Sequence, residues 1–120
     1  MALPTWKPKD RYPYARHPES RPCSVTIESG DYVYVQDADG IIWVARNAPH
    51  QHPKVLGGAQ SAAAAGELVI GDQGRVVEVN NLSGTFRLGP ETLDAVVQAL
   101  RDLGLEVPED SIKRYPKEFL

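Results

Sequence analysis

The chain has 120 residues, 42% of them hydrophobic, so it is long enough for one domain with a modest core. A formal net charge of −3 gives no overall basic surface for nucleic acid, and a single cysteine excludes an internal disulfide. No apolar run approaches the ~20 residues of a membrane helix, and the first residues lack the apolar region of a secretory signal. We therefore expect a soluble, cytoplasmic protein with no membrane contact.

Residues 1–23 differ from the rest in being rich in proline, aromatic and basic side chains. Proline fixes φ and pushes the preceding residue out of the α region, so this segment is expected to be an extended arm. Its aromatic side chains favour docking over free disorder, on the single domain of residues 24–120 or on a protein partner. RNA is an alternative partner for the basic arm, but the acidic balance of the rest of the chain disfavours nucleic acid.

Two pairs of β-rich runs predict two β-hairpins. Each run is rich in β-branched or aromatic residues, and the members of a pair are separated by a turn rich in Asp and Gly. In chain order the runs are residues 31–36, 41–45, 67–70 and 75–80. Residues 24–28 and 84–88 are further strand candidates.

The clearest element is an amphipathic helix over residues 90–103. Pro90 suits the first helical position, and Glu91 and Asp94 suit the positive end of the helix dipole. The apolar stripe, spaced i, i+3, i+4, i+7, consists of Leu93, Val96, Val97, Leu100 and Leu103. Gly104 can end the helix in a left-handed conformation, and one edge strand can follow. The expected fold class is α+β, a small antiparallel sheet of two or more β-hairpins packed against one C-terminal amphipathic helix.

Residues 47–66 connect the two hairpins without a firm element. A connection of about 20 residues is unusual in a compact domain and is either functional or contains an unrecognised element. This one holds His50, His52 and a run of small residues. The structural interpretation is that residues 60–65 form a short helix or an inner strand.

The order of short motifs along the chain resembles a small domain family. The motifs are His52, Gly57-Gly58, Ala65-Gly66-Glu67, Asn81, Ser83-Gly84, Phe86 and Pro90, followed by the amphipathic helix. The family is the domain at the C-termini of some bacterial polymorphic-toxin and effector proteins, and it is also similar to a segment of the plant IQ-motif calmodulin-binding proteins. The resemblance covers residues 32–105 and implies an architecture and a toxin or effector context rather than a particular reaction.

Two departures from the family pattern bear on chemistry. Where the family reads His-Ser-Ser this chain has His52-Pro53-Lys54, and where it reads Ser-Gly-His-Tyr this chain has Ser83-Gly84-Thr85-Phe86. A threonine hydroxyl does not titrate near neutrality, so Thr85 cannot replace a histidine as general acid or base. We therefore expect a surface for binding where the His52 loop meets the helix N-terminus. The candidate binding residues are His50, Lys54, Gly57, Gly58, Thr85, Phe86 and Arg87.

The candidate catalytic residues are His52, Glu67 and Ser83. His52 titrates near neutrality, and the carboxylate of Glu67 can orient its second ring nitrogen. In the structural alternative His52 caps a turn, Glu67 accepts backbone N–H bonds at a strand start, and Ser83 and Asn81 bond local backbone.

Metal and thiol chemistry find little support. His50 and His52 with His17 or Cys23 would supply zinc ligands, but no spacing enforces that set, and we expect no metal or other cofactor. Cys23 has no motif around it that would supply a base, so a small buried residue is expected there rather than a nucleophile.

Two classes of function follow from these observations. The favoured one is a non-catalytic protein-binding or interaction module of bacterial toxin or effector type, because the second histidine is replaced and no catalytic set is complete. The alternative is a toxin-like enzyme, a nuclease or transferase, using His52 and Glu67.

Overall fold

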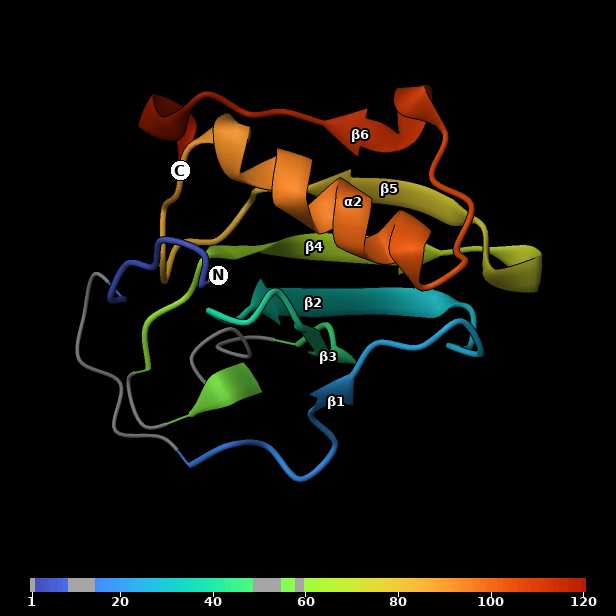
Figure 1. Cartoon of the computed structure of the whole chain (residues 1–120), viewed down its shortest axis with the longest axis horizontal. Coiled ribbons are helices and arrows are strands. Elements are labelled where there is room, and N and C mark those ends of the chain that lie inside the picture. Colours follow the sequence, from blue (N-terminus) through green and yellow to red (C-terminus); the bar gives the residue numbers. More distant parts are fainter. Residues whose placement is uncertain (1, 9–14, 49–54, 58–59) are drawn as a thin grey trace.

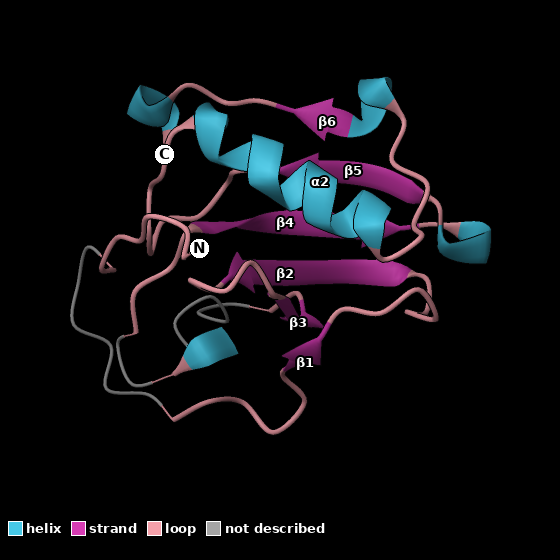
Figure 2. Ribbon diagram, in the orientation of Figure 1, coloured by secondary structure: helices cyan, strands magenta, loops and turns pink. Residues whose placement is uncertain are grey.

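The computed structural model describes residues 2–8, 15–48, 55–57 and 60–120. These residues form a six-stranded mixed sheet, with the helix α2 (Leu93–Asp102) across one face (Figures 1 and 2). The expected α+β class is confirmed. In the order of the sheet the strands are β1 (Arg21–Pro22), β3 (Ile42–Arg46), β2 (Gly30–Gln36), β4 (Ala64–Ile70), β5 (Val76–Asn80) and β6 (Ile112–Lys113). Single 3-10 turns are η1 (Asp72–Gly74), η2 (Pro90–Thr92), η3 (Glu109–Ser111) and η4 (Lys117–Phe119).

The sheet is not wholly antiparallel, so that part of the expectation is wrong. β2 pairs antiparallel with both β3 and β4, and β4 pairs antiparallel with β5. β6 runs parallel to β5. The cause is the helix, because α2 carries the chain over the sheet between β5 and β6, and parallel neighbours need such a crossover.

β4 begins three residues before the run that the sequence indicated, at Ala64 rather than at residue 67. The structural interpretation of an inner strand is therefore right for the end of the long connection. Small residues are needed here because a side chain at Gly66 would collide with the carbonyl of Asn80 and the ring of Tyr34. The Tyr34 hydroxyl donates to that same carbonyl at 2.8 Å. Ala and Gly have weak β propensity. Here the neighbouring Tyr34 ring leaves no room for a larger side chain, so packing outweighs propensity.

The two further strand candidates are turns. The N–H of Ile27 bonds the carbonyl of Ser24 at 3.1 Å, and the N–H of Arg87 bonds that of Ser83 at 2.8 Å. Each segment thus satisfies backbone groups locally instead of in the sheet.

α2 buries one stripe against the sheet. Leu93, Val96, Val97 and Leu100 are at most 6% exposed and pack in the larger core cluster. Leu103, expected in the stripe, is instead 39% exposed, because the helix ends at Asp102. No helix in the described ranges is both long enough and apolar enough to cross a membrane.

The helix ends through the glycine that follows it. Gly104 has φ of 97°, and its N–H bonds the carbonyl of Arg101 at 2.9 Å. The chain thereby reverses, and Leu105 enters the core in place of Leu103 at 4% exposed.

The opposite face of the sheet carries a second, smaller cluster. Its buried members are Val33, Val35, Ala45, Val55, Ala62, Ala65, Phe86 and Leu88. Alternate residues of β2 therefore serve two cores, since Tyr32 and Tyr34 face the helix while Val33 and Val35 face away from it.

The described parts of the N-terminal arm lie against the domain. The N–H of Leu3 bonds the carbonyl of Ala38, and Trp6 and Ala62 exchange two backbone hydrogen bonds, all at 2.8 Å. β1 pairs with β3, although the expected boundary between arm and domain fell after residue 23. The arm therefore completes one edge of the sheet.

Candidate functional site

The predicted histidine site falls largely outside the described residues. His50, His52, Lys54 and Gly58 all lie in the ranges that the structure leaves out. The pairing of His52 with Glu67 thus stays a prediction. Among the residues that are described, no three His, Cys, Asp or Glu side chains gather in a way that would hold a metal ion.

Glu67 belongs to a polar network at the end of the β4–β5 ladder. Asn80 donates from Nδ2 to Glu67 Oε1 at 3.2 Å and to Glu78 Oε2 at 2.7 Å. Its Oδ1 accepts the N–H of Glu67 at 2.9 Å, and Asn47 donates to Glu67 Oε2 at 3.2 Å. The Glu67 carboxylate thus accepts side-chain amides, rather than the backbone N–H groups of the structural alternative.

Ser83 serves local backbone, as the structural alternative holds, whereas Asn81 mainly bonds backbone that is distant in the sequence. Ser83 Oγ accepts the N–H of Phe86 at 3.3 Å. Asn81 is fully buried, donates to the carbonyls of Leu88 and Tyr115 at 3.1 and 2.9 Å, and accepts the N–H of Tyr115 at 2.9 Å. The Asn81 side chain thus ties the segment after β5 to the C-terminal segment.

The described members of the predicted binding set lie mostly inside the molecule. Thr85 and Phe86 are buried, and Phe86 belongs to the second-face cluster. Gly57 has φ of 75° and lies against the backbone of Arg16, where a Cβ would collide. Arg87 alone of these four is exposed, and its Nε donates to the carbonyl of Gly84 at 3.0 Å.

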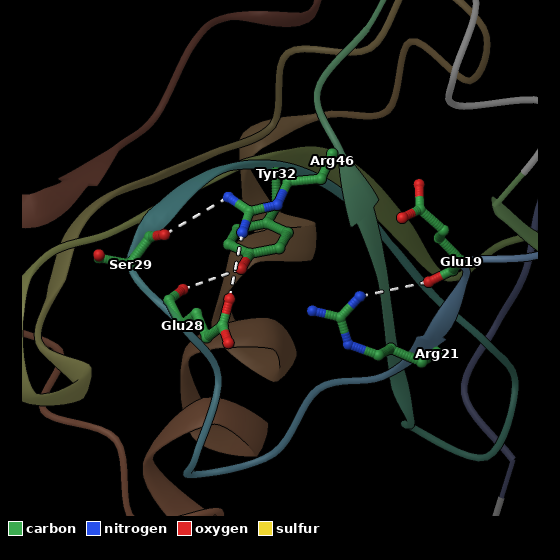
Figure 3. Close-up of polar contacts among 6 residues, drawn as sticks. All are labelled: Glu19, Arg21, Glu28, Ser29, Tyr32 and Arg46. Carbon is green, nitrogen blue, oxygen red and sulfur yellow. Dashed lines mark hydrogen bonds and ion pairs between the residues drawn. The ribbon is translucent and has the colours of Figure 1, made fainter.

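A different place gathers charged side chains around a hollow. A cavity of about 340 Å³ lies between β1 and the turn that follows it. Figure 3 shows Arg21 and Glu28, which line it, with Glu19, Ser29, Tyr32 and Arg46. The cavity is lined by Arg21, Pro22, Cys23, Ser24, Thr26, Ile27, Glu28 and Val44.

Arg46 is held over a buried tyrosine by the β2–β3 register. Tyr32 and Arg46 are cross-strand partners, and the Arg46 Cζ lies 4.8 Å from the centre of the Tyr32 ring. Tyr32 is fully buried, and its hydroxyl donates to the carbonyl of Glu28 at 2.8 Å. The ring is therefore fixed, and its face attracts the guanidinium as a cation–π partner.

Arg21 reaches the same ring from β1. Its Cζ lies 5.8 Å from the Tyr32 ring centre, and its Nη1 donates to the carbonyl of Glu19 at 3.3 Å. Two guanidinium groups therefore share one aromatic side chain (Figure 3). We call these three residues the Arg21–Tyr32–Arg46 cluster.

The carboxylate beside the cluster is weakly held. Arg46 Nη2 lies 3.5 Å from Glu28 Oε2, and the two side chains are 47% and 82% exposed. An ion pair this exposed contributes about 0–1 kcal/mol, so a competing carboxylate can displace it at little cost. The second contact, from Arg46 Nη1 to the carbonyl of Ser29, is also long at 3.4 Å.

Cys23 lines the cavity but is poorly suited to nucleophilic attack. Burial raises the pKa of Cys23 to about 11, while Arg21 and a backbone hydrogen bond to Ser24 lower it less. The residue is therefore a neutral thiol near pH 7, and the thiolate is the nucleophile. The expectation of a small buried residue is confirmed.

The sequence contained half of the signal for this cluster. The hairpin itself could be predicted, but its actual register, with Gln36 opposite Ile42, places Tyr32 opposite Arg46, one residue beyond the partner that a turn at residues 37–40 would give. No sequence pattern predicts that Arg21 pairs with β3, because β1 is too short for a periodic pattern, at two residues, and contains a proline.

The fold and the site together define a small α+β domain with an arginine-flanked polar cavity. No family model, curated protein or solved structure matches this chain.

Proposed function

We propose that this domain is a non-catalytic protein-interaction module that binds an acidic segment of a partner protein at the Arg21–Tyr32–Arg46 cluster. The observation that carries the proposal is the placement of two guanidinium groups against one buried tyrosine ring beside a cavity of about 340 Å³. Guanidinium groups bind carboxylates through two parallel N–H donors, and each has five donors to offer.

Preorganisation favours binding at this cluster. Part of the cost of using an arginine in an interface is the ordering of its long side chain. Stacking on Tyr32 reduces that cost for Arg46, and to a lesser degree for Arg21. Arginine and tyrosine are also the residue types that most often dominate binding energy in protein interfaces.

The surroundings suit an extended peptide segment. A second cavity of about 320 Å³ shares Thr26, Ile27 and Glu28 with the first, so the hollow continues past the turn. Val25 on that turn is 52% exposed and lies against Gly104, next to the exposed Leu103. Apolar side chains beside arginines are typical of protein interfaces. A nucleic-acid partner is less well matched, because the whole chain carries a net charge of −3.

The toxin or effector context is part of the proposal and follows from the motif resemblance alone. The alternative function, a toxin-like enzyme, requires His52 to act with Glu67. The two asparagines that already bond the Glu67 carboxylate weigh against that role.

A peptide titration tests the interaction proposal. We expect a labelled octaglutamate peptide to raise fluorescence anisotropy on binding, and an octaserine peptide to give no signal. Arg21→Gln and Arg46→Gln should each weaken binding about 10-fold or more, because each removes a charge-assisted contact worth about 1.5–3 kcal/mol.

Arg114→Gln is the matched control, because Arg114 pairs with Asp94 of α2 and belongs neither to the cavity lining nor to the Arg21–Tyr32–Arg46 cluster. It should change the affinity less than about 2-fold, in the range of screened long-distance effects. An equal loss in Arg114→Gln, or no binding by the natural chain, would refute the proposed site.

The enzyme alternative is tested by expression in a bacterial host. Growth arrest by the natural chain that His52→Ala relieves would favour the enzyme over the interaction module. We expect equal growth of both strains.

A further inference from the structure

The arginine that lines the cavity beside β1 has donors to spare. The guanidinium of Arg21 donates one hydrogen bond within the described residues, from Nη1 to the carbonyl of Glu19 at 3.3 Å (Figure 3). Four of its five N–H donors therefore have no acceptor in that part of the chain. No carboxylate there forms an ion pair with Arg21, and the residue is exposed. Its positive charge is thus open to a ligand.

Two hydroxyl groups in the lining of the same cavity leave one further donor. Ser24 Oγ and Thr26 Oγ1 lie 3.0 Å apart, so one hydroxyl donates to the other. Each hydroxyl has a single hydrogen, and their mutual bond uses one of the two. The second hydrogen has no acceptor among the described residues, and both side chains are exposed. The surface of the cavity is mostly polar, as a site for a charged group requires.

These donors match a phosphate group better than a carboxylate. A guanidinium binds an anion through two parallel N–H bonds, which engage both oxygens of a carboxylate. A phosphate monoester has a third terminal oxygen, which can accept the remaining hydroxyl hydrogen, and it carries a charge of about −1.5 to −2 near pH 7. The cavity, at about 340 Å³, is large enough to take a whole phosphorylated side chain.

Glu28 favours the same ligand because it competes for Arg46. It is the acidic residue of the described lining, and its Oε2 lies 3.5 Å from Arg46 Nη2. A partner carboxylate that takes this place exchanges one single negative charge for another. A phosphate group brings more negative charge to the same guanidinium, so it competes with Glu28 more strongly.

We propose that the acidic segment of the partner carries a phosphorylated serine or threonine, and that its phosphate group enters this cavity. Arg21 binds two of the phosphate oxygens, and the Ser24–Thr26 hydroxyl pair donates to the third. Arg46 attracts the remaining negative charge of the segment. This inference rests on the proposed function, because it specifies the partner of the same site.

Three labelled octapeptides test the inference by fluorescence anisotropy. All consist of glutamate except at one central position, which is phosphoserine, glutamate or serine. The phosphoserine peptide should bind at least about 10-fold more tightly than the other two, as one added charge-assisted hydrogen bond predicts. Equal binding by the phosphoserine and glutamate peptides would overturn the inference and leave the proposed function standing. Binding by none of the three would refute the proposed function itself.

Inorganic phosphate separates a phosphorylated segment from the free ion. It should displace the phosphoserine peptide only in large excess, because the flanking glutamates add contacts that the ion lacks. Displacement by inorganic phosphate at the peptide's own concentration would assign the cavity to the free ion and overturn the proposal.

A double variant tests the hydroxyl pair. Ser24→Ala with Thr26→Val should weaken the phosphoserine peptide about 5-fold or more and octaglutamate less than about 2-fold, because the hydroxyls serve the third phosphate oxygen. The preserved binding of octaglutamate also shows that the site is folded. Thr5→Val with Ser61→Ala is the matched control, because it removes the same two hydroxyl types outside the cavity and should change neither affinity. Unchanged phosphoserine binding in the first double variant, or an equal loss for both peptides, would overturn the proposal.

Discussion

At the scale of single residues, the candidate site depends on a glycine that contributes no side chain. Gly30 has φ of 152°, and a Cβ there would collide with Nη1 of Arg46. The missing side chain lets Arg46 lie over Tyr32 and reach the carbonyl of Ser29. A backbone position at the start of β2 thereby decides where a charged group lies.

Replacing Gly30 by alanine should therefore both destabilise the fold and displace Arg46. We expect Gly30→Ala to lower the free energy of unfolding by about 1–3 kcal/mol in urea titrations. Gly84→Ala is the matched control, because no atom lies within 4 Å of the position that its Cβ would take. A control variant as destabilised as Gly30→Ala would show that neither the backbone strain at φ of 152° nor the contact with Arg46 is the cause.

The buried thiol of Cys23 predicts a pH dependence of stability with a definite sign. Its pKa is raised in the folded protein from the model-compound value of 9.0 to about 11, because burial disfavours the charged form. Its contribution to stability is thus complete below pH 9 and is lost as the pH rises through 11.

Urea titrations at several alkaline pH values should show this effect as a difference between two proteins. The free energy of unfolding of the natural chain should fall more steeply above pH 9 than that of Cys23→Ala, which lacks the group. Parallel curves for the two proteins would mean that the thiol titrates equally in the folded and unfolded states.

At the scale of elements, Asn80 joins β4 and β5 where their regular pairing stops. The register reaches Leu68 opposite Val79, and beyond it the Asn80 side chain takes over. Its Oδ1 accepts the N–H groups of Glu67 and Leu82 at 2.9 and 3.0 Å. One side chain thus satisfies two backbone donors that would otherwise have no partner from the ladder.

Asn80→Ala should be strongly destabilising for this reason. Two partly buried backbone N–H groups lose their acceptor, and we expect a loss of about 2–4 kcal/mol in the free energy of unfolding. The comparison is Asn47→Ala, which removes a single bond to Glu67 from an exposed residue and should cost less than about 1 kcal/mol. If both variants lost a similar free energy of unfolding, the hydrogen bonds of Asn80 to the two backbone N–H groups would not be the stabilising interaction.

At the scale of the whole molecule, the predictable parts are those that repeat a periodic pattern. The stripe from Leu93 to Leu100 and the alternating residues of β2 and β5 have such a pattern, and strands and a helix are found there. The parts that pattern could not predict are β1, two residues long, and the first residues of β4, whereas β6 lies where an edge strand was expected after the helix. Their strand conformation follows from tertiary contacts, such as the pairing of Arg21 with Val44, which no local periodicity reports.

The candidate site divides in the same way. The contact of Arg46 with Tyr32 follows from the hairpin register, whereas the approach of Arg21 follows from the path of the arm around the edge of β3. The predicted site around His52 was inferred from motif order, and that histidine lies outside the described residues. The order of motifs along a chain does not determine which side chains the fold brings together.

The central claim, that a partner's carboxylates bind between Arg21 and Arg46, is tested most directly by NMR of the arginine Nε–H groups. On addition of octaglutamate peptide, the Nε–H resonances of Arg21 and Arg46 should shift together and saturate at one peptide concentration. Those of Arg75, Arg101 and Arg114, which pair with Glu106, Glu109 and Asp94 elsewhere, should stay in place. Equal shifts of all five arginines, or shifts confined to the three distant ones, would contradict the account.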